Sequence, residues 1–253
     1  MFNPVRWFID LNKKCFRYVA KLFPNTKTGI DTYYFGWVRE NLADNYTIVD
    51  VGGGRGWHLA SERRKFTGLK LIAVDPSEEQ LRYNKDADEK IIFAMGTDER
   101  VPIEDNSADI VTSHMVVEHI SNNDYTMREI SRILKPGGKF ICAIPNKFAL
   151  FAVINQMLPN WLARKILFTL RPETREGHGF KAYYDRTYYP AMQKLLARYG
   201  FVETKFAFTY NQSIYFAFFL PFGLISLMWD FLMYLFRVKP LCAYLCFITY
   251  KKP

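Results

Sequence analysis

Four glycines stand close together directly after a short apolar segment: Gly52, Gly53, Gly54 and Gly56. The apolar segment, residues 48–51, has the composition of a β-strand, and the residues after the glycines could open a helix. Glycines in such a turn allow the backbone to approach a ligand closely, because no Cβ stands in the way. The stretch from residue 46 to residue 60 therefore predicts a turn that binds a nucleotide-like ligand.

The spacing of the glycines distinguishes between kinds of nucleotide-binding turn. A dinucleotide-binding turn has the pattern G-x-G-x-x-G, and that pattern begun at Gly52 would need a glycine where Trp57 stands. A phosphate-binding P-loop would end in Gly-Lys-Ser or Gly-Lys-Thr, and neither occurs. The segment instead reads acid-x-Gly-x-Gly-x-Gly from Asp50 to Gly56. This spacing disfavours a nicotinamide dinucleotide and a P-loop nucleotide.

Polar residues at the ends of two later strands are further ligand candidates. Residues 70–74 are a predicted strand that leads into Asp75, at the interval from the glycines where an acid reaches the ribose hydroxyls of a nucleoside. Asp75 could also cap the helix predicted to begin at Pro76, and both roles can hold together. A further strand ends at Ser113 and His114, which we expect to face the pocket because ligands bind at the carboxyl ends of such strands.

The order of these motifs resembles the class I S-adenosylmethionine-dependent methyltransferases, in particular the branch typified by ubiquinone/menaquinone-biosynthesis methyltransferases. The resemblance covers residues 46–146 and includes D-N-S-A-D at 105–109, V-E-H at 117–119 and R-I-L-K-P-G-G-K at 132–139. It implies S-adenosyl-L-methionine as the cofactor. The family's adenine-contacting acid aligns with Thr97, and Asp98 comes one residue later. The implied cofactor-binding residues are Asp50, Gly52, Gly54, Gly56, Asp75, Pro76, Thr97, Asp98, Ser113 and His114.

Histidines and tyrosines are the candidates for the acceptor chemistry. An oxygen or nitrogen nucleophile that must lose a proton benefits from a base, and histidine is the first candidate for that role. His119 ends the V-E-H phrase, although it could also be a helix-terminus histidine bonded to the backbone. His178 precedes a Tyr183-Tyr184 pair, and similar proteins carry such a cluster over the acceptor pocket. We predict His119, His178 and Tyr184 as catalytic candidates, with His114 as a weaker one, and no metal site.

Basic segments flank an acidic middle of the chain. Residues 1–30 have six Lys or Arg against one acid, residues 31–134 have 12 against 19, and residues 135–253 have 16 against five. Because the cations accompany long apolar runs, they favour an anionic membrane surface over nucleic acid. Residues 6–23 predict a basic amphipathic helix that binds a membrane interface or, alternatively, caps the domain. Its apolar side would carry Phe8, Leu11, Cys15, Val19 and Leu22.

A second apolar segment, residues 213–236, contains Asp230 as its only charged residue. Its uninterrupted part is too short to span a membrane. Pro221 and Gly223 predict two short helices that meet at a bend. Such a pair would lie at the mouth of the pocket or enter a lipid leaflet; alternatively, it packs on its own domain or forms a dimer interface.

The alternation of strands and helices predicts an α/β fold with a doubly wound, mostly parallel sheet. Residues 241–250 predict a seventh strand, and the resemblance implies that the last two strands form an antiparallel edge. We expect a basic helix and linker at 1–30 and a methyltransferase domain at 31–253, with an apolar insertion at about 213–239. Four scattered cysteines indicate a reducing compartment.

The expected function is S-adenosylmethionine-dependent methyl transfer to a hydrophobic small-molecule or lipid acceptor at a membrane surface. A quinone-type ring or a lipid is the expected acceptor, with O-methylation slightly favoured. We expect a cytoplasmic protein, peripheral on the inner face of the membrane, with no nucleic-acid partner. Two alternatives stay open: a non-catalytic S-adenosylmethionine-binding membrane scaffold and a nicotinamide-dependent oxidoreductase.

Overall fold

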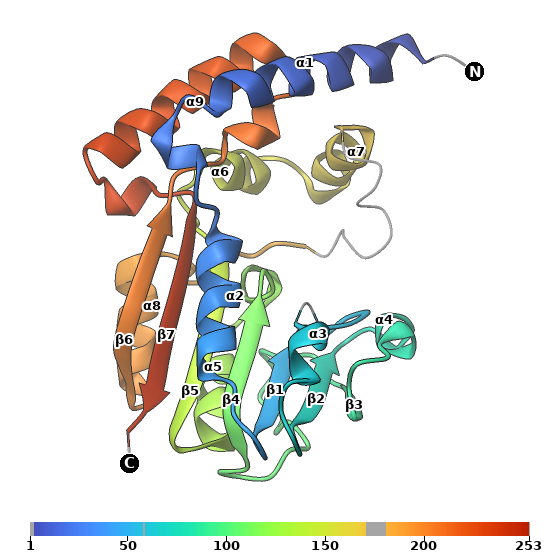
Figure 1. Cartoon of the computed structure of the whole chain (residues 1–253), viewed down its shortest axis with the longest axis vertical. Coiled ribbons are helices and arrows are strands. Elements are labelled where there is room, and N and C mark those ends of the chain that lie inside the picture. Colours follow the sequence, from blue (N-terminus) through green and yellow to red (C-terminus); the bar gives the residue numbers. More distant parts are fainter. Residues whose placement is uncertain (1–2, 58, 171–180, 253) are drawn as a thin grey trace.

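The computed structural model describes residues 3–57, 59–170 and 181–252. Within them the strands form one sheet in the order β3-β2-β1-β4-β5-β7-β6 (Figure 1). β7 runs antiparallel to both of its neighbours, and the other pairs are parallel. The strands are β1 Thr47–Val51, β2 Lys70–Asp75, β3 Glu89–Ile92, β4 Ala108–His114, β5 Leu134–Pro145, β6 Phe201–Thr209 and β7 Tyr244–Lys251. The predicted doubly wound, mostly parallel sheet with an antiparallel edge is confirmed.

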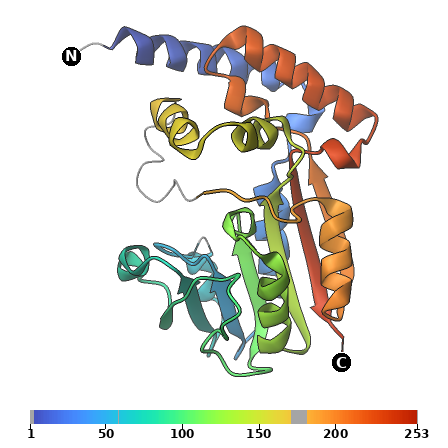
Figure 2. The same ribbon diagram turned by 180° about the vertical axis from the view of Figure 1, so that it is seen from behind.

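Helices cover both faces of this sheet. The α-helices of the described residues are α1 Pro4–Ala20, α2 Ile30–Asn41, α3 Ala60–Arg63, α4 Glu78–Tyr83, α5 Asn123–Ile133, α6 Leu150–Met157, α7 Asn160–Leu170, α8 Tyr189–Arg198 and α9 Leu220–Leu235. Successive side chains of a strand point to opposite faces, so Val49 packs with the α5 and α8 side while Ile48 packs with α2. Figure 1 shows α2 in front of the sheet. Figure 2, which views the molecule from the opposite side, shows α5 and α8 in front of the sheet.

The helices α1 and α9 lie side by side across the carboxyl end of the parallel strands, with α6 and α7 between them and the sheet (Figures 1 and 2). Asn12 Oδ1 accepts a hydrogen bond from Leu220 N at 2.8 Å. A Cβ on Gly223 would lie 2.9 Å from Phe16 Cδ2, so this glycine permits the close approach of the two helices. The rings of Phe23 and Phe231 meet edge to face at 5.3 Å.

The prediction of two short helices that meet at a bend is wrong. The segment forms a short 3-10 turn at Ser213–Phe216 and then the single helix α9. Pro221 lies in the first turn of α9. The N–H groups of a first turn have no partner within the helix, so proline costs no helical hydrogen bond there. Pro221 therefore begins the helix rather than interrupting it.

Asp230 fastens α9 to the segment that precedes it. Its side chain is buried, and its carboxylate accepts hydrogen bonds from Ser213 N at 2.8 Å and from Gln212 Nε2 at 3.1 Å. We expect Asp230→Ala to lower the free energy of unfolding by about 1–3 kcal/mol, because both donors stay buried without an acceptor. Urea unfolding measures this, with Asp230→Asn as the control that keeps an acceptor oxygen. Identical midpoints for Asp230→Ala and the unaltered protein would contradict the assignment.

Candidate active site

The glycine turn joins β1 to α3 beside the end of β2. Gly52 N and Gly53 N both donate to Val74 O, at 2.7 and 3.2 Å. Gly52 has φ +80°, and a Cβ there would lie 2.2 Å from Val116 Cγ2. Glycine is required at this position by both the conformation and the contact. The turn is therefore a tight cradle of backbone atoms at the carboxyl end of the sheet.

Asp75 lies at the tip of β2, where its carboxylate meets the glycine turn. Oδ2 accepts a hydrogen bond from Gly54 N at 3.2 Å, and Oδ1 accepts one from Ser77 N at 2.8 Å. Burial raises the pKa of Asp75, and these backbone donors oppose the rise. The side chain that caps α4 belongs to Ser77, whose Oγ accepts from Gln80 N at 3.2 Å. Each carboxylate oxygen of Asp75 still has a lone pair for a ligand hydroxyl.

A small open pocket lies beside the glycine turn. Its lining comprises Tyr34, Phe35, Asp50, Gly52, Gly56, Trp57, Leu59 and His114. Asp50 Oδ1 accepts a hydrogen bond from Thr112 Oγ1 at 2.7 Å, and burial raises the pKa of Asp50 to about 7. His114 Nε2 lies 2.9 Å from Asp31 Oδ1. The structure thus brings Asp50, the glycines and His114 together, within reach of Asp75.

The aromatic part of this lining comes from α2, which sequence reasoning did not assign to the site. The Tyr34 and Phe35 rings lie 4.7 and 5.3 Å from the His114 ring, measured between centroids. The available signal was the aromatic cluster at residues 33–37. That cluster could be assigned to the site only with the knowledge that α2 lies against the carboxyl ends of β1 and β4.

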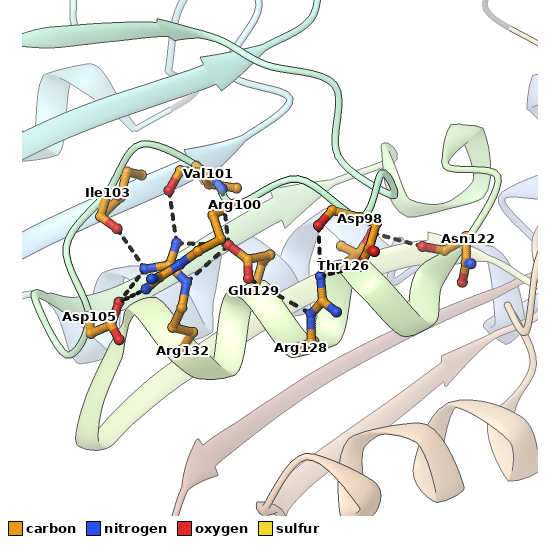
Figure 3. A network of polar contacts seen from close by, with 10 residues as sticks. All are labelled: Asp98, Arg100, Val101, Ile103, Asp105, Asn122, Thr126, Arg128, Glu129 and Arg132. Atoms are coloured by element: carbon orange, nitrogen blue, oxygen red, sulfur yellow. Dashed lines mark hydrogen bonds and ion pairs between the residues drawn. The ribbon is translucent and has the colours of Figure 1, made fainter.

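Thr97 and Asp98 lie on the turn after β3 and do not line the pocket. The Asp98 carboxylate forms an ion pair with Arg128 of α5, with Oδ1 and Nη2 2.9 Å apart (Figure 3). Gly96 has φ +88°, and a Cβ there would lie 2.5 Å from Ile120 Cγ2. This turn is therefore packed against the segment after β4, with the Asp98 side chain directed toward α5.

The D-N-S-A-D phrase and its partners form a structural network rather than a binding site. Arg132 donates to Val101 O and Ile103 O at 2.8 and 2.7 Å and pairs with Glu129 and Asp105 (Figure 3). These bonds fix the loop between β3 and β4 onto α5. The phrase thus identifies the fold without supplying chemistry.

The V-E-H phrase forms a short 3-10 turn, Val117–His119, directly after β4. Tyr183 N and Tyr184 N donate to Glu118 O at 2.8 and 3.0 Å. His119 Nδ1 lies 3.1 Å from Lys181 O. The structure therefore brings His119 and Tyr184 together at the carboxyl end of β4, whereas His178 lies outside the described residues.

Tyr184 and Glu118 are both buried at this point. Tyr184 has φ +52°, its hydroxyl accepts from Asn155 Nδ2 at 3.4 Å, and burial raises its pKa to about 12. Glu118 is 5% exposed, and burial raises its pKa to about 8. The sequence predicted a catalytic role for His119 and none for Glu118, because the burial of a carboxyl group leaves no signal in the sequence. Ser113 lies deeper, fully buried on β4 beside Cys142 of β5.

Sequence comparisons agree with this geometry. Residues 49–142 match the family described as methyltransferase domain. The ubiquinone/menaquinone biosynthesis C-methyltransferase UbiE of Rubrivivax gelatinosus is 33% identical over 100 residues, 38% of this chain and 38% of that protein. The ubiquinone biosynthesis O-methyltransferase of Maricaulis maris is 31% identical over 140 residues, 52% of this chain and 54% of that protein. The matches thus span between about a third and about half of the length of these curated relatives.

A solved structure shares the fold across most of the chain. Geranyl diphosphate C-methyltransferase from Streptomyces coelicolor, in complex with Mg²⁺, geranyl diphosphate and S-adenosyl-L-homocysteine, superposes with a TM-score of 0.54 at 14% identity. The similarity covers 86% of this chain and 78% of that one. Residues 49–142 therefore match a methyltransferase domain, the chain is similar to curated methyltransferases over that part, and its fold is shared with a solved methyltransferase; these similarities agree with S-adenosyl-L-methionine as the ligand of the glycine cradle.

Proposed function

We propose that this protein transfers a methyl group from S-adenosyl-L-methionine to a hydrophobic small-molecule or lipid acceptor at a membrane surface, with O-methylation slightly favoured. The observation that carries the proposal is the glycine cradle with Asp75 at the carboxyl end of the sheet, beneath helices with exposed apolar faces. The two relatives described above are named for ubiquinone and menaquinone biosynthesis, which supports a hydrophobic acceptor.

The cradle residues fit the cofactor. The Asp75 carboxylate would accept hydrogen bonds from the ribose hydroxyls, and the peptide groups of the glycine turn would approach the methionine part. Asp50 and His114 border the same pocket, and Pro76, Thr97 and Asp98 remain candidates around the adenine. When bound, the cofactor supplies a methyl group on a positively charged sulfur. The residues around it mainly position the acceptor in line, which supplies much of the acceleration in such displacements.

Apolar side chains exposed on α1, α7 and α9 support a hydrophobic interface. They include Trp7, Phe8 and Leu11 on α1, Trp161 and Ile166 on α7, and Phe222, Ile225 and Trp229 on α9. The α1 residues that pack inward are instead Ile9, Asn12, Phe16 and Ala20, so most of the apolar side expected from the sequence stays exposed. Lys14, Arg17 and Lys21 lie exposed on the same helix. An exposed apolar face flanked by cations is the pattern of a helix that lies in an anionic membrane interface.

This surface predicts peripheral binding, because no helix in the described parts of the chain is long and apolar enough to cross a bilayer. We expect co-sedimentation with anionic phosphatidylglycerol vesicles that weakens at high salt. The triple variant Phe8→Ser, Leu11→Ser, Ile225→Ser should lose about 10-fold or more of this binding, since each side chain buries apolar area in the interface. Ile92→Ser, an exposed apolar residue on β3, is the matched control and should bind normally. Equal sedimentation of the triple variant and the control would contradict a membrane role for this face.

The activity itself is tested with a labelled methyl donor and a total lipid extract. We expect label to appear in an organic-soluble product that is stable to alkali, which excludes a methyl ester. Release of the label as methyl iodide by hot hydriodic acid then identifies a methyl ether, because a C-methyl group resists this cleavage. Binding of adenosylhomocysteine without any labelled product would favour the non-catalytic scaffold. Binding of NADH in place of adenosylhomocysteine would contradict the whole assignment.

A further inference from the structure

Glu118 carries a buried carboxyl oxygen that makes no hydrogen bond within residues 3–57, 59–170 and 181–252. Its side chain is more than nine-tenths buried, and Oε2 has no hydrogen-bond partner among the described residues. A buried carboxyl oxygen without a partner costs free energy, so folding alone gives no reason to keep it. Because ligands bind at the carboxyl ends of the strands in an α/β sheet, an unpartnered carboxyl oxygen just after β4 is a candidate hydrogen-bond partner for a ligand.

The backbone at Glu118 is bonded to a segment that lies far from it in the sequence. The Glu118 carbonyl accepts two consecutive N–H groups, from Tyr183 and Tyr184, which clamp the 181–184 segment onto the turn after β4. Tyr184 adopts φ +52° within this clamp, and Met115 adopts φ +56° just before the turn. Strained backbone held in place by its surroundings is typical of functional sites. The clamp holds the Glu118 turn against the segment that carries Tyr184, whose hydroxyl interacts electrostatically with the Glu118 carboxyl group.

The polar and titratable groups around Glu118 come from three elements. His119 on the same turn has Nε2 3.9 Å from Glu118 Oε1 and is about one-third exposed. Tyr184 from the clamp and Cys142 from β5 are buried and interact electrostatically with Glu118. Burial raises the pKa of Glu118 to about 8, as well as those of Tyr184 and Cys142. Of these groups, Glu118 is the one matched to accept a weakly acidic proton near neutral pH.

We propose that Glu118 accepts the proton of a hydroxyl-bearing acceptor, a phenol or an enol, whose oxygen points at Glu118 Oε2. This inference rests on the proposed function and names the acceptor class and the proton acceptor. The acceptor oxygen forms a bond to the methyl carbon with its own lone pair, and the carbon–sulfur bond breaks with its electrons kept by sulfur. The proton of the hydroxyl passes to Glu118 and from there, by way of the partly exposed His119, to solvent.

The activity test compares the unaltered protein with Glu118→Gln, which keeps the shape and removes the base. Transfer of labelled methyl to the lipid extract should rise with pH through about 8 in the unaltered protein. Glu118→Gln should lower kcat by about 10²–10⁴-fold, and its rate should no longer rise with pH through about 8. Glu118→Asp should recover part of the loss. Adenosylhomocysteine affinity, measured by calorimetry, should stay within about twofold in both variants, since Glu118 does not line the cofactor pocket.

A second readout does not depend on turnover. Infrared difference spectra between pH 6 and pH 10 should show protonated carboxyl bands that disappear as the pH rises. Glu118→Gln should lose the component that titrates near pH 8, while the component of Asp50, near pH 7, remains. Equal transfer rates and equal pH profiles for both proteins, or an unchanged carboxyl band, would overturn the proton-acceptor role. Absence of transfer by the unaltered protein, with adenosylhomocysteine bound, would instead contradict the proposed function, and this inference would fall with it.

Discussion

Replacing Gly52 with alanine is expected to lower the affinity for adenosylhomocysteine by about 100-fold. A residue with a Cβ at φ +80° costs about 1–3 kcal/mol, and every 1.4 kcal/mol corresponds to a tenfold change in affinity. The new methyl group would also lie 2.2 Å from Val116 Cγ2, so the turn must move away from Val74 and distort the cradle. Isothermal titration calorimetry measures the effect directly.

Gly36→Ala is the matched control for this variant. Gly36 lies within α2, and nothing lies within 4 Å of a Cβ placed there. The added methyl should leave affinity unchanged and raise stability slightly, because alanine favours a helix over glycine. Unchanged affinity in Gly52→Ala would show that the turn accommodates a Cβ and that its conformation does not determine cofactor binding.

Stability is expected to fall as pH rises from about 4.5 to 8. Burial raises the pKa of Asp230 to about 6, of Asp50 to about 7 and of Glu118 to about 8. The folded protein therefore binds more protons than the unfolded chain between the ordinary carboxyl pKa and these values, and the free energy of unfolding decreases with pH in that window. Each shifted group contributes on the order of 3–5 kcal/mol.

Urea unfolding at pH 4.5, 6 and 8 measures this slope. Asp50→Asn and Glu118→Gln should each flatten it, because an amide has no proton to lose. Asp105 and Asp124 have lowered pKa values owing to nearby arginines, so their smaller, solvent-screened contribution is lost only below about pH 4. Stability that is highest at pH 8 would show that the three carboxyl groups are ionised without penalty.

The sequence predicted the features that depend on neighbouring residues. The strand, glycines and Asp75 form a local pattern whose meaning is set by spacing, and the structure joins Gly54 N to Asp75 as that pattern implies. The alternation of elements likewise predicted the sheet, because each helix must cover one face of it.

Features that depend on packing could not be predicted. The sequence of α1 shows an apolar stripe but not that Ile9 and Phe16 pack inward while Phe8 and Leu11 stay exposed. Pro221 fits both a bend and a first helical turn, and only the contact of Gly223 with Phe16 decides between them. For the same reason the burial of Glu118 could not be predicted from the sequence, because β5 and the 181–184 segment produce it.

In the proposed complex, the Asp75 carboxylate accepts hydrogen bonds from the ribose hydroxyls of the cofactor, which lies above the glycine turn. Calorimetry with adenosylhomocysteine should show a loss of about 100-fold for Asp75→Ala, because two hydrogen bonds to a charged acceptor disappear. Asp75→Asn should be weakened less, since it keeps one acceptor oxygen, and Glu79→Gln on the neighbouring helix α4 should bind normally. Folding of each variant is checked by urea unfolding. This ranking is the expected result, and an Asp75→Ala protein that is folded and binds adenosylhomocysteine as tightly as the unaltered protein would contradict it.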